Sequence, residues 1–269
     1  MRMKLCMTVL LAWLGFCGAT VSAVVPRIEV NPDGKGLKLL VFEGSDHHRN
    51  YVDRGKILGD LYFNYLADNK AYSVNLSDLQ PEILENTAGK IQLFWQFPAG
   101  VRLYQTFTVS GEEIEWDIEF FNRSRHTVNI MDMCLTVPIG AIDESVQACQ
   151  NLNRHFSLNG SSSFLYWIPY TGQGDILLMS MKKGTAMEYA TWDGKYYLHA
   201  TNVVDRANDT WRIPSTSKTV APYHRYLTGF NFTVAKDYTD LRGKLYDKGN
   251  VLVKVAPGMV VTPEMEVYC

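Results

Sequence analysis

The chain has 269 residues, 46% of them hydrophobic and 20% charged, with a formal net charge of −2 at pH 7. This composition excludes a chain that is disordered throughout and predicts a protein with a large buried core. The basic residues form no cluster, which argues against nucleic acid as a partner because phosphate binding needs grouped Lys and Arg.

The chain begins with the features of a signal peptide. Arg2 and Lys4 precede an apolar run over residues 7–16, and small residues at 21–23 fit a cleavage site. The apolar run is shorter than the ~20 residues that a membrane helix needs. We therefore expect no membrane span, and a secreted or periplasmic protein after cleavage near Ala23.

Cysteine usage predicts little covalent stapling. Cys134, Cys149 and Cys269 follow the signal peptide, and an odd number cannot form a complete disulfide framework. A bridge between Cys134 and Cys149 is one interpretation, and two small buried apolar side chains are the other. We expect the core to supply most of the stability.

The next segments combine a hairpin with a polar stretch. Residues 24–41 contain two strand-like runs around an Asn-Pro-Asp-Gly turn, which predicts a β-hairpin. Asp46, His47, His48 and Asp53 then lie close together in the sequence. Neighbouring residues on an extended chain point to opposite faces, so the two histidines are poorly placed to share one ion, and we expect no metal site.

The middle of the chain alternates between apolar and polar residues with a period of two. A strand is expected at 59–66 and a loop at 67–89, followed by three strands at 91–97, 101–109 and 114–120 that form an antiparallel meander with one buried face. An acidic row occupies alternate positions of the last strand, and we interpret it as a solvated face rather than a catalytic pair. Its members are Glu113, Glu115, Asp117 and Glu119.

More strands and one helix complete the pattern. Strands are expected at 128–137, 164–170, 175–181, 195–201, 226–234 and 250–255. Asp237 as an N-cap, Leu241 and Leu245 at helical spacing and Gly249 as a stop predict a short helix. The fold class is therefore all-β, a large antiparallel β-sandwich with one short helix near the C-terminus. We expect one domain at 24–256 and a linker-like tail at 257–269 that leads to an absent or separate domain.

Candidate site residues gather in the central segment. No G-x-S-x-G, H-E-x-x-H, P-loop or paired C-x-x-C motif occurs anywhere in the chain. Arg154, His155, Trp167 and Tyr170 are the kinds of side chain that bind carbohydrate, because flat rings stack on sugar C–H faces and guanidinium groups bond hydroxyls. The alternative is that the aromatic residues fill the core.

The order of several segments resembles a known family. These segments are G-D-L-Y-F-N-Y-L, Q-T-F-T-V-S-G-E-E-I-E-W, F-S-L-N-G-S-S-S-F-L-Y-W and D-Y-T-D-L-R-G-K-L-Y-D-K-G. They are similar to the N-terminal supersandwich, a galactose-mutarotase-like domain, of secreted bacterial six-hairpin glycosidase-like proteins. In that family an (α/α)6 toroid follows the sandwich and supplies the catalytic acids. The resemblance implies a non-catalytic scaffold or glycan-contacting domain, with a helical toroid as partner and no cofactor.

Two other functions stay open. Asn153 and His155 have a superficial similarity to aldose 1-epimerases, which suggests an enzyme with His155 as acid and Glu188 as base. Arg154 interrupts that motif. The third hypothesis is a stand-alone carbohydrate-binding or surface interaction module, which requires exposed aromatic side chains.

Overall fold

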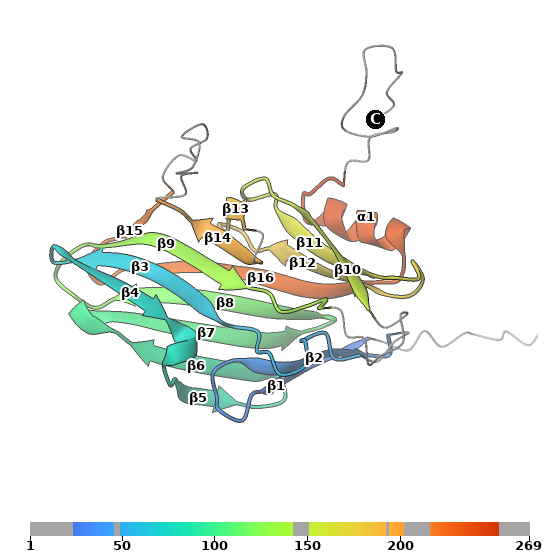
Figure 1. The fold of residues 1–269 in the computed structure, drawn as a ribbon, viewed down its shortest axis with the longest axis horizontal. Coiled ribbons are helices and arrows are strands. Elements are labelled where there is room, and N and C mark those ends of the chain that lie inside the picture. The colour runs from blue at the N-terminus through green and yellow to red at the C-terminus, as the bar shows by residue number, and fades with distance from the viewer. Residues whose placement is uncertain (1–23, 46–48, 142–150, 192–193, 202–215, 253–269) are drawn as a thin grey trace, which may run out of the picture.

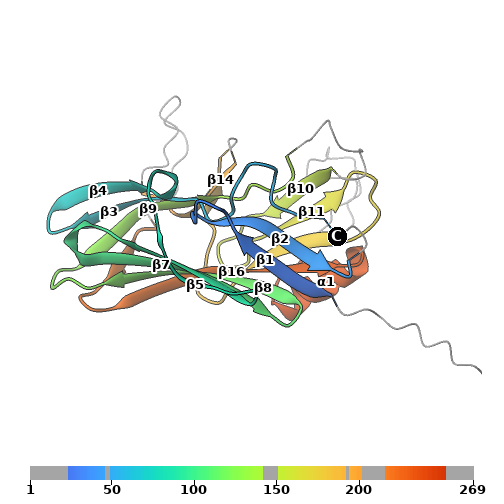
Figure 2. The same ribbon diagram turned by 90° about the horizontal axis from the view of Figure 1, so that it is seen from below.

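The computed structural model describes residues 24–45, 49–141, 151–191, 194–201 and 216–252. Two antiparallel sheets lie face to face, as the edge-on view in Figure 2 shows. The larger sheet contains, in spatial order, β10 (Leu152–Ser157), β11 (Phe164–Pro169), β12 (Ile176–Met181), β16 (Arg225–Ala235), β8 (Glu113–Asn122), β7 (Val101–Ser110), β6 (Lys90–Gln96) and β5 (Glu82–Asn86).

The smaller sheet has six strands (Figure 1). In spatial order they are β13 (Tyr189–Ala190), β14 (Lys195–His199), β9 (Val128–Thr136), β3 (Leu61–Ala67) and β4 (Lys70–Asn75), with β15 (Lys218–Val220) also paired to β9. A separate hairpin is made by β1 (Val25–Val30) and β2 (Leu37–Glu43), and two 3-10 turns are η1 (Leu76–Asp78) and η2 (Pro98–Gly100). The predictions of an all-β antiparallel sandwich, of the N-terminal hairpin and of the meander are confirmed.

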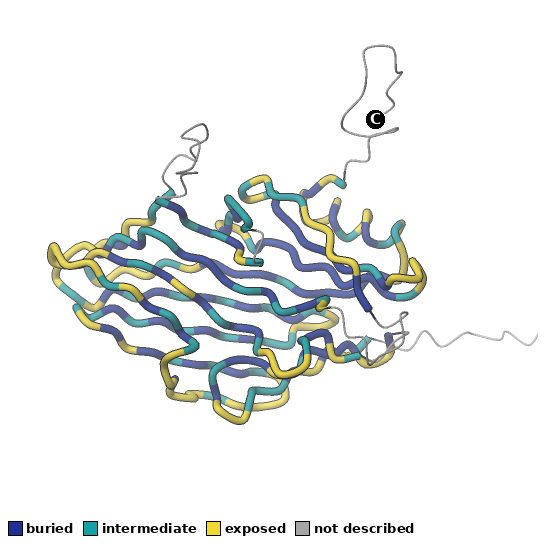
Figure 3. The backbone as a smooth tube through the Cα atoms, in the orientation of Figure 1, coloured by how far each residue is buried: buried dark blue, intermediate teal, exposed yellow. Residues whose placement is uncertain are grey.

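The core lies between the two sheets and follows the alternation in the sequence. Buried and less buried residues alternate along most strands (Figure 3), as strands with one inward face require. Phe63 of β3 meets Phe120 of β8 across the sandwich, with ring centroids 4.9 Å apart. Trp116 donates its Nε1–H to Gln105 at 3.0 Å, and Gln105 donates to the carbonyl of Gly59 at 2.8 Å, so these two buried polar side chains have partners.

The predicted helix is α1 (Tyr238–Asp247), and it covers one end of the larger sheet (Figure 1). The Asp237 side chain accepts hydrogen bonds from the backbone N–H groups of Thr239 and Asp240, which confirms the predicted N-cap. Leu241 and Leu245 are buried in a second small core on the outer face of that sheet. Their neighbours are Phe164, Tyr166, Ile176, Leu178 and Ala235.

The expected loop at 67–89 is wrong, because it contains β4, η1 and β5. Asp68 and Asn69 both have positive φ, 49° and 58°, and form the two-residue turn that joins β3 to β4. Asp-Asn is a weaker turn signal than Asn-Gly, so the sequence pattern does not predict β4 after this turn. The strand expected at 250–255 is not formed at 250–252, and the rest of it lies outside the described residues.

The acidic row on β8 is half-buried and paired, and not the solvated face that was predicted. Lys182 Nζ lies 2.6 Å from Glu115 and 2.7 Å from Asp117. The side chain of Lys182 crosses β16 at Gly229, where a Cβ atom would lie 3.1 Å from Lys182 Cδ. Because Gly229 has no side chain, Lys182 can pass over β16 and reach the two acidic residues on β8. The other two pairs are Lys248 with Glu113 and Arg225 with Glu119.

Several predictions fall on residues outside the described part. They are the signal peptide, the His47–His48 segment, Cys149, Cys269 and the tail at 257–269. The domain bounds and the Cys134–Cys149 bridge therefore stay predictions, although Cys134 itself is buried. Among the described residues, no helix is long and apolar enough to cross a membrane, and no group of three or more His, Cys, Asp or Glu side chains is placed to hold a metal ion.

Candidate functional site

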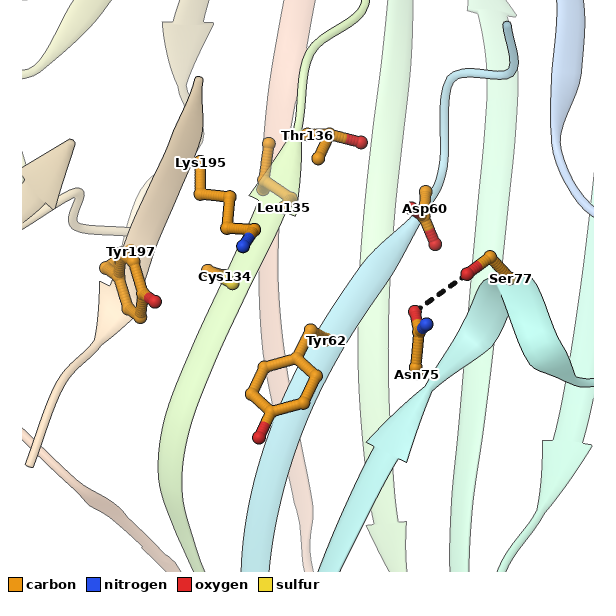
Figure 4. Close-up of a pocket in the computed structure, with 9 residues that line it drawn as sticks. All are labelled: Asp60, Tyr62, Asn75, Ser77, Cys134, Leu135, Thr136, Lys195 and Tyr197. Carbon is orange, nitrogen blue, oxygen red and sulfur yellow. Dashed lines mark hydrogen bonds between the residues drawn. The ribbon is translucent and has the colours of Figure 1, made fainter. Parts of the chain in front are cut away.

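The outer face of the smaller sheet carries a row of four side chains across four neighbouring strands. Strand register aligns Tyr197 of β14 with Cys134 of β9, Cys134 with Tyr62 of β3, and Tyr62 with Asn75 of β4. We call these four residues the tyrosine row. Strands two apart are separated by about 10 Å, so the two tyrosines stand on either side of the small Cys134 (Figure 4).

A second row lies beside the tyrosine row, two residues away along each chain segment. Lys195 of β14 pairs with Thr136 of β9, and the backbone N–H of Thr136 donates to the carbonyl of Asp60 at 3.3 Å. We call Lys195, Thr136, Asp60 and Ser77 the charged row. The Lys195 side chain extends over β9 toward the centre of the site (Figure 4). Together the two rows line a cavity of about 410 Å³.

The alternation of the strands explains why these residues share one face. Leu61, Leu135 and Tyr196 point into the core and are 1% exposed, so their neighbours on each strand point outward. The turn η1 carries the chain past the end of β4. There the Ser77 hydroxyl donates to Asn75 Oδ1 at 2.9 Å and connects the charged row to the tyrosine row.

Asp60 has the most unusual surroundings in the cavity. Burial raises the pKa of its carboxyl group, although backbone N–H groups of Ser77 and Leu61 act in the opposite direction. Its Oδ1 atom is buried and has no hydrogen-bond partner among the described residues. Buried acceptors are nearly always satisfied in folded proteins, so this atom is suited to accept from a ligand hydroxyl.

A second cavity of about 420 Å³ adjoins the first and shares Asp60 and Thr136 with it. Asp53, Lys56 and Arg154 also line it. The Asp53 carboxylate accepts from the backbone N–H of Gly140 at 3.0 Å and of Ala141 at 3.1 Å, and burial raises the pKa of this carboxyl group. The two cavities form one groove from the tyrosine row to Arg154.

The four sequence-predicted carbohydrate ligands are not brought together. Arg154 and His155 are neighbours on β10 and point to opposite faces of the larger sheet. Arg154 lies over the ring of Tyr196, with 5.7 Å from Cζ to the centroid. His155 stacks on Tyr166 with ring centroids 4.9 Å apart, beside α1 and away from the groove, and burial lowers the pKa of its imidazole.

Trp167 and Tyr170 also differ in environment. Trp167 is completely buried and donates its Nε1–H to the carbonyl of Ile139 at 3.0 Å. Its ring therefore has no face open to a sugar. It instead fixes the segment at 137–141, whose N–H groups hold Asp53. Tyr170 is 41% exposed after β11.

The acid and base of the epimerase hypothesis lie in different sheets. His155 is on β10 of the larger sheet, and Glu188 precedes β13 of the smaller one. Glu188 donates its backbone N–H to Tyr197, and no hydrogen bond or ion pair joins its carboxylate to His155 within the described chain. The geometry does not support a shared proton-transfer site.

Sequence reasoning missed most of the residues that line the groove. Tyr62 and Asp60 stand in the segment G-D-L-Y-F-N-Y-L, where their period of two marks a polar face. Lys195 and Tyr197 show the same period in K-Y-Y-L-H. The signal for each strand was present, but the alignment of these strands through β9 depends on pairings that the sequence does not specify.

No family model matches the chain, and no curated protein matches it. Among solved structures it is similar to the polysaccharide lyase BACCELL_00875, with a TM-score of 0.67 and 15% identity. This match covers 87% of the present chain and 35% of the lyase, so the chain spans about a third of the lyase's length. At this identity the similarity shows a shared fold.

Weaker matches include two other proteins. A galactose mutarotase related enzyme from Lactobacillus acidophilus has a TM-score of 0.48 and 9% identity, over 81% of this chain and 97% of that protein. The GH36 α-galactosidase AgaB from Geobacillus stearothermophilus has a TM-score of 0.42 and 11% identity, over 84% of this chain and 41% of the galactosidase. Both are too distant to support an inference about this chain.

Proposed function

We propose that the protein is an exported, non-catalytic β-sandwich module that binds a glycan in the groove of the smaller sheet. The observation that carries this proposal is the pair Tyr62 and Tyr197 on either side of Cys134, next to the unpartnered Asp60 Oδ1. A sugar offers apolar C–H faces to aromatic rings and hydroxyls to polar groups, so it fits both rows. A pocket of this size with a few placed polar groups is typical of small-ligand sites.

The carboxyl groups of the groove support a binding role rather than hydrolysis. Most glycoside hydrolases use two carboxyl groups, one on either side of the scissile bond. Asp60 is the one carboxyl group among the described residues that line the tyrosine-row cavity. Asp53, in the adjoining cavity, already accepts from two backbone N–H groups.

In this proposal the module holds a glycan for a separate catalytic domain of a glycoside-hydrolase-like protein. The helical toroid of the family that the sequence resembles is the partner we propose. The similarity to the lyase extends over about a third of that protein, which fits a module within a larger chain. A stand-alone carbohydrate-binding module would use the same groove, and activity of the full gene product distinguishes these two forms of the proposal.

The test is binding of oligosaccharides to the purified chain. A glycan array identifies ligands, and titration calorimetry then compares the wild type with Tyr62→Ala and Tyr197→Ala. Loss of an aromatic contact worth about 1.4 kcal/mol weakens binding tenfold, so each variant is expected to bind about tenfold more weakly. Tyr246→Ala is the matched control, because Tyr246 is 77% exposed on α1, and it should bind like the wild type.

Two results would overturn the proposal. If no glycan binds, or if both tyrosine variants keep wild-type affinity, the groove is not a glycan site. If the purified chain releases reducing sugar from a polysaccharide, the module is not a non-catalytic one.

A further inference from the structure

The second cavity contains two cationic side chains without an anionic partner. Lys56 and Arg154 both line it, and neither side chain makes a hydrogen bond or an ion pair within the described part of the chain. Lys56 follows Asp53 in a turn closed by its own backbone N–H, which donates to the Asp53 carbonyl at 3.0 Å. Two cations therefore line one space of about 420 Å³, Arg154 from β10 of the larger sheet and Lys56 from the turn that precedes β3.

Asp53 does not neutralise this pair of cations. Its Oδ1 accepts from Gly140 and Ala141, and its Oδ2 lies 3.2 Å from the Ala141 nitrogen. No ion pair within 4.0 Å connects it to Lys56 or Arg154 among the described residues, although both cations favour its ionised form electrostatically. The carboxylate is thus held by the backbone of the segment that Trp167 fixes.

The charges of the second cavity balance formally. Among the described residues that line it, two are cationic, Lys56 and Arg154, and two are carboxyl groups, Asp53 and Asp60. Burial raises the pKa of both carboxyl groups, which disfavours their ionised forms. The two cations are therefore the groups that an anionic ligand would meet in this partly enclosed space.

Arg154 is also held in position for a ligand. Its guanidinium lies over the Tyr196 ring at 5.7 Å, which restricts the side chain through a cation–π contact. A guanidinium has a planar fork of donors that matches the two oxygens of a carboxylate or a sulfate. Lys56 lines the same cavity and adds a point charge.

We propose that the cavity of Lys56 and Arg154 is an anion subsite, so that the groove takes an oligosaccharide with an acidic substituent next to the sugar held by the tyrosine row. This inference rests on the proposed glycan binding in the groove. The acidic substituent is a uronate carboxylate or a sulfate ester, since both present oxygens to the guanidinium. The anionic group and the tyrosine-bound sugar occupy adjoining cavities that share Asp60 and Thr136.

The test compares three oligosaccharides of equal length by titration calorimetry with the full chain. One is neutral, one carries uronate residues and one carries sulfate esters. At least one acidic oligosaccharide should bind ten or more times tighter than the neutral one, and raising the salt concentration should reduce this difference. The acidic oligosaccharide that binds tighter identifies which of the two anionic groups the subsite prefers.

Variants separate this inference from the proposed function. Arg154→Gln and Lys56→Gln should each weaken the acidic oligosaccharide about tenfold and leave the neutral one unchanged, whereas Tyr62→Ala should weaken both. Lys183→Gln, at an exposed lysine outside the groove, is the matched control. Equal affinity for neutral and acidic ligands, or equal weakening of both by Arg154→Gln, overturns the anion subsite while leaving glycan binding intact. Failure of every ligand to bind overturns both proposals.

Discussion

Gly229 of β16 is predicted to tolerate no side chain, because two strands and a lysine meet at this position. An added Cβ would lie 2.5 Å from the backbone oxygen of Trp116 and 2.8 Å from Asp117 Oδ1. The first contact is with backbone at the centre of the larger sheet, so relief requires a shift of β16 or β8. The second lies at the ion pair that Lys182 makes with Asp117.

The magnitude follows from these contacts. Overpacking in a filled site costs about 1–3 kcal/mol, and disturbance of a partly exposed ion pair adds at most ~1 kcal/mol. The gain from a less flexible unfolded chain, about 0.4–1 kcal/mol, opposes these terms. Gly229→Ala should therefore lower the free energy of unfolding by ~2 kcal/mol, which lowers Tm by about 4–8 °C for a chain of this size.

Thermal and urea unfolding followed by circular dichroism measure this change. Gly243→Ala is the matched control, since Gly243 is inside α1 and a Cβ there would meet no heavy atom within 4 Å. Alanine in an exposed helix is favoured over glycine by up to ~1 kcal/mol, so the control should raise Tm by a few degrees. A Gly229→Ala protein as stable as the wild type would refute the close packing of β16, β8 and Lys182.

Two further stability predictions concern the groove and the segment that supports it. Burial raises the pKa of the Asp60 carboxyl group, so its ionised form is disfavoured in the folded state. The ionised carboxylate therefore destabilises the fold at any pH above the pKa of the folded state. This destabilisation disappears as the pH falls below the pKa of the unfolded state. Asp60→Asn should therefore be more stable than the wild type at pH 7 and lose that advantage near pH 3–4, as urea titrations across the pH range can measure; a variant that is less stable at pH 7 would contradict this interpretation. Trp167→Phe leaves the buried Ile139 carbonyl without its donor and should lower the free energy of unfolding by about 1–3 kcal/mol. An unchanged urea midpoint would show that this hydrogen bond does not fix residues 137–141.

The sequence predicts those parts of the fold that depend on local pattern. The meander follows from strict alternation over β6, β7 and β8, and α1 follows from Asp237 and the spacing of Leu241 and Leu245. The loop expected at 67–89 fails for a local reason, since Asp68 and Asn69 form a tight turn from a weak signal.

The candidate site was less predictable, because it depends on pairings distant in the sequence. The period of two shows that Tyr62 and Tyr197 each share a face with their polar neighbours, but β9 brings them into one row, and no local pattern specifies that register. Trp167 and Tyr166 illustrate the same limit. Both are buried, on opposite faces of β11, because the sandwich covers one face and α1 covers the other. Strand β11 therefore contributes side chains to both cores, and the neighbouring strand β10 contributes Arg154 to the groove.

The most direct test of glycan binding in the groove is an NMR titration of the isotope-labelled chain with an oligosaccharide chosen from the array. Chemical shift changes are predicted to concentrate at residues 60–62, 75–77, 134–136 and 195–197, which contain the tyrosine row and the charged row. Changes confined to the His155 face beside α1, or no changes at ligand concentrations that saturate the array signal, would contradict the groove as the binding site.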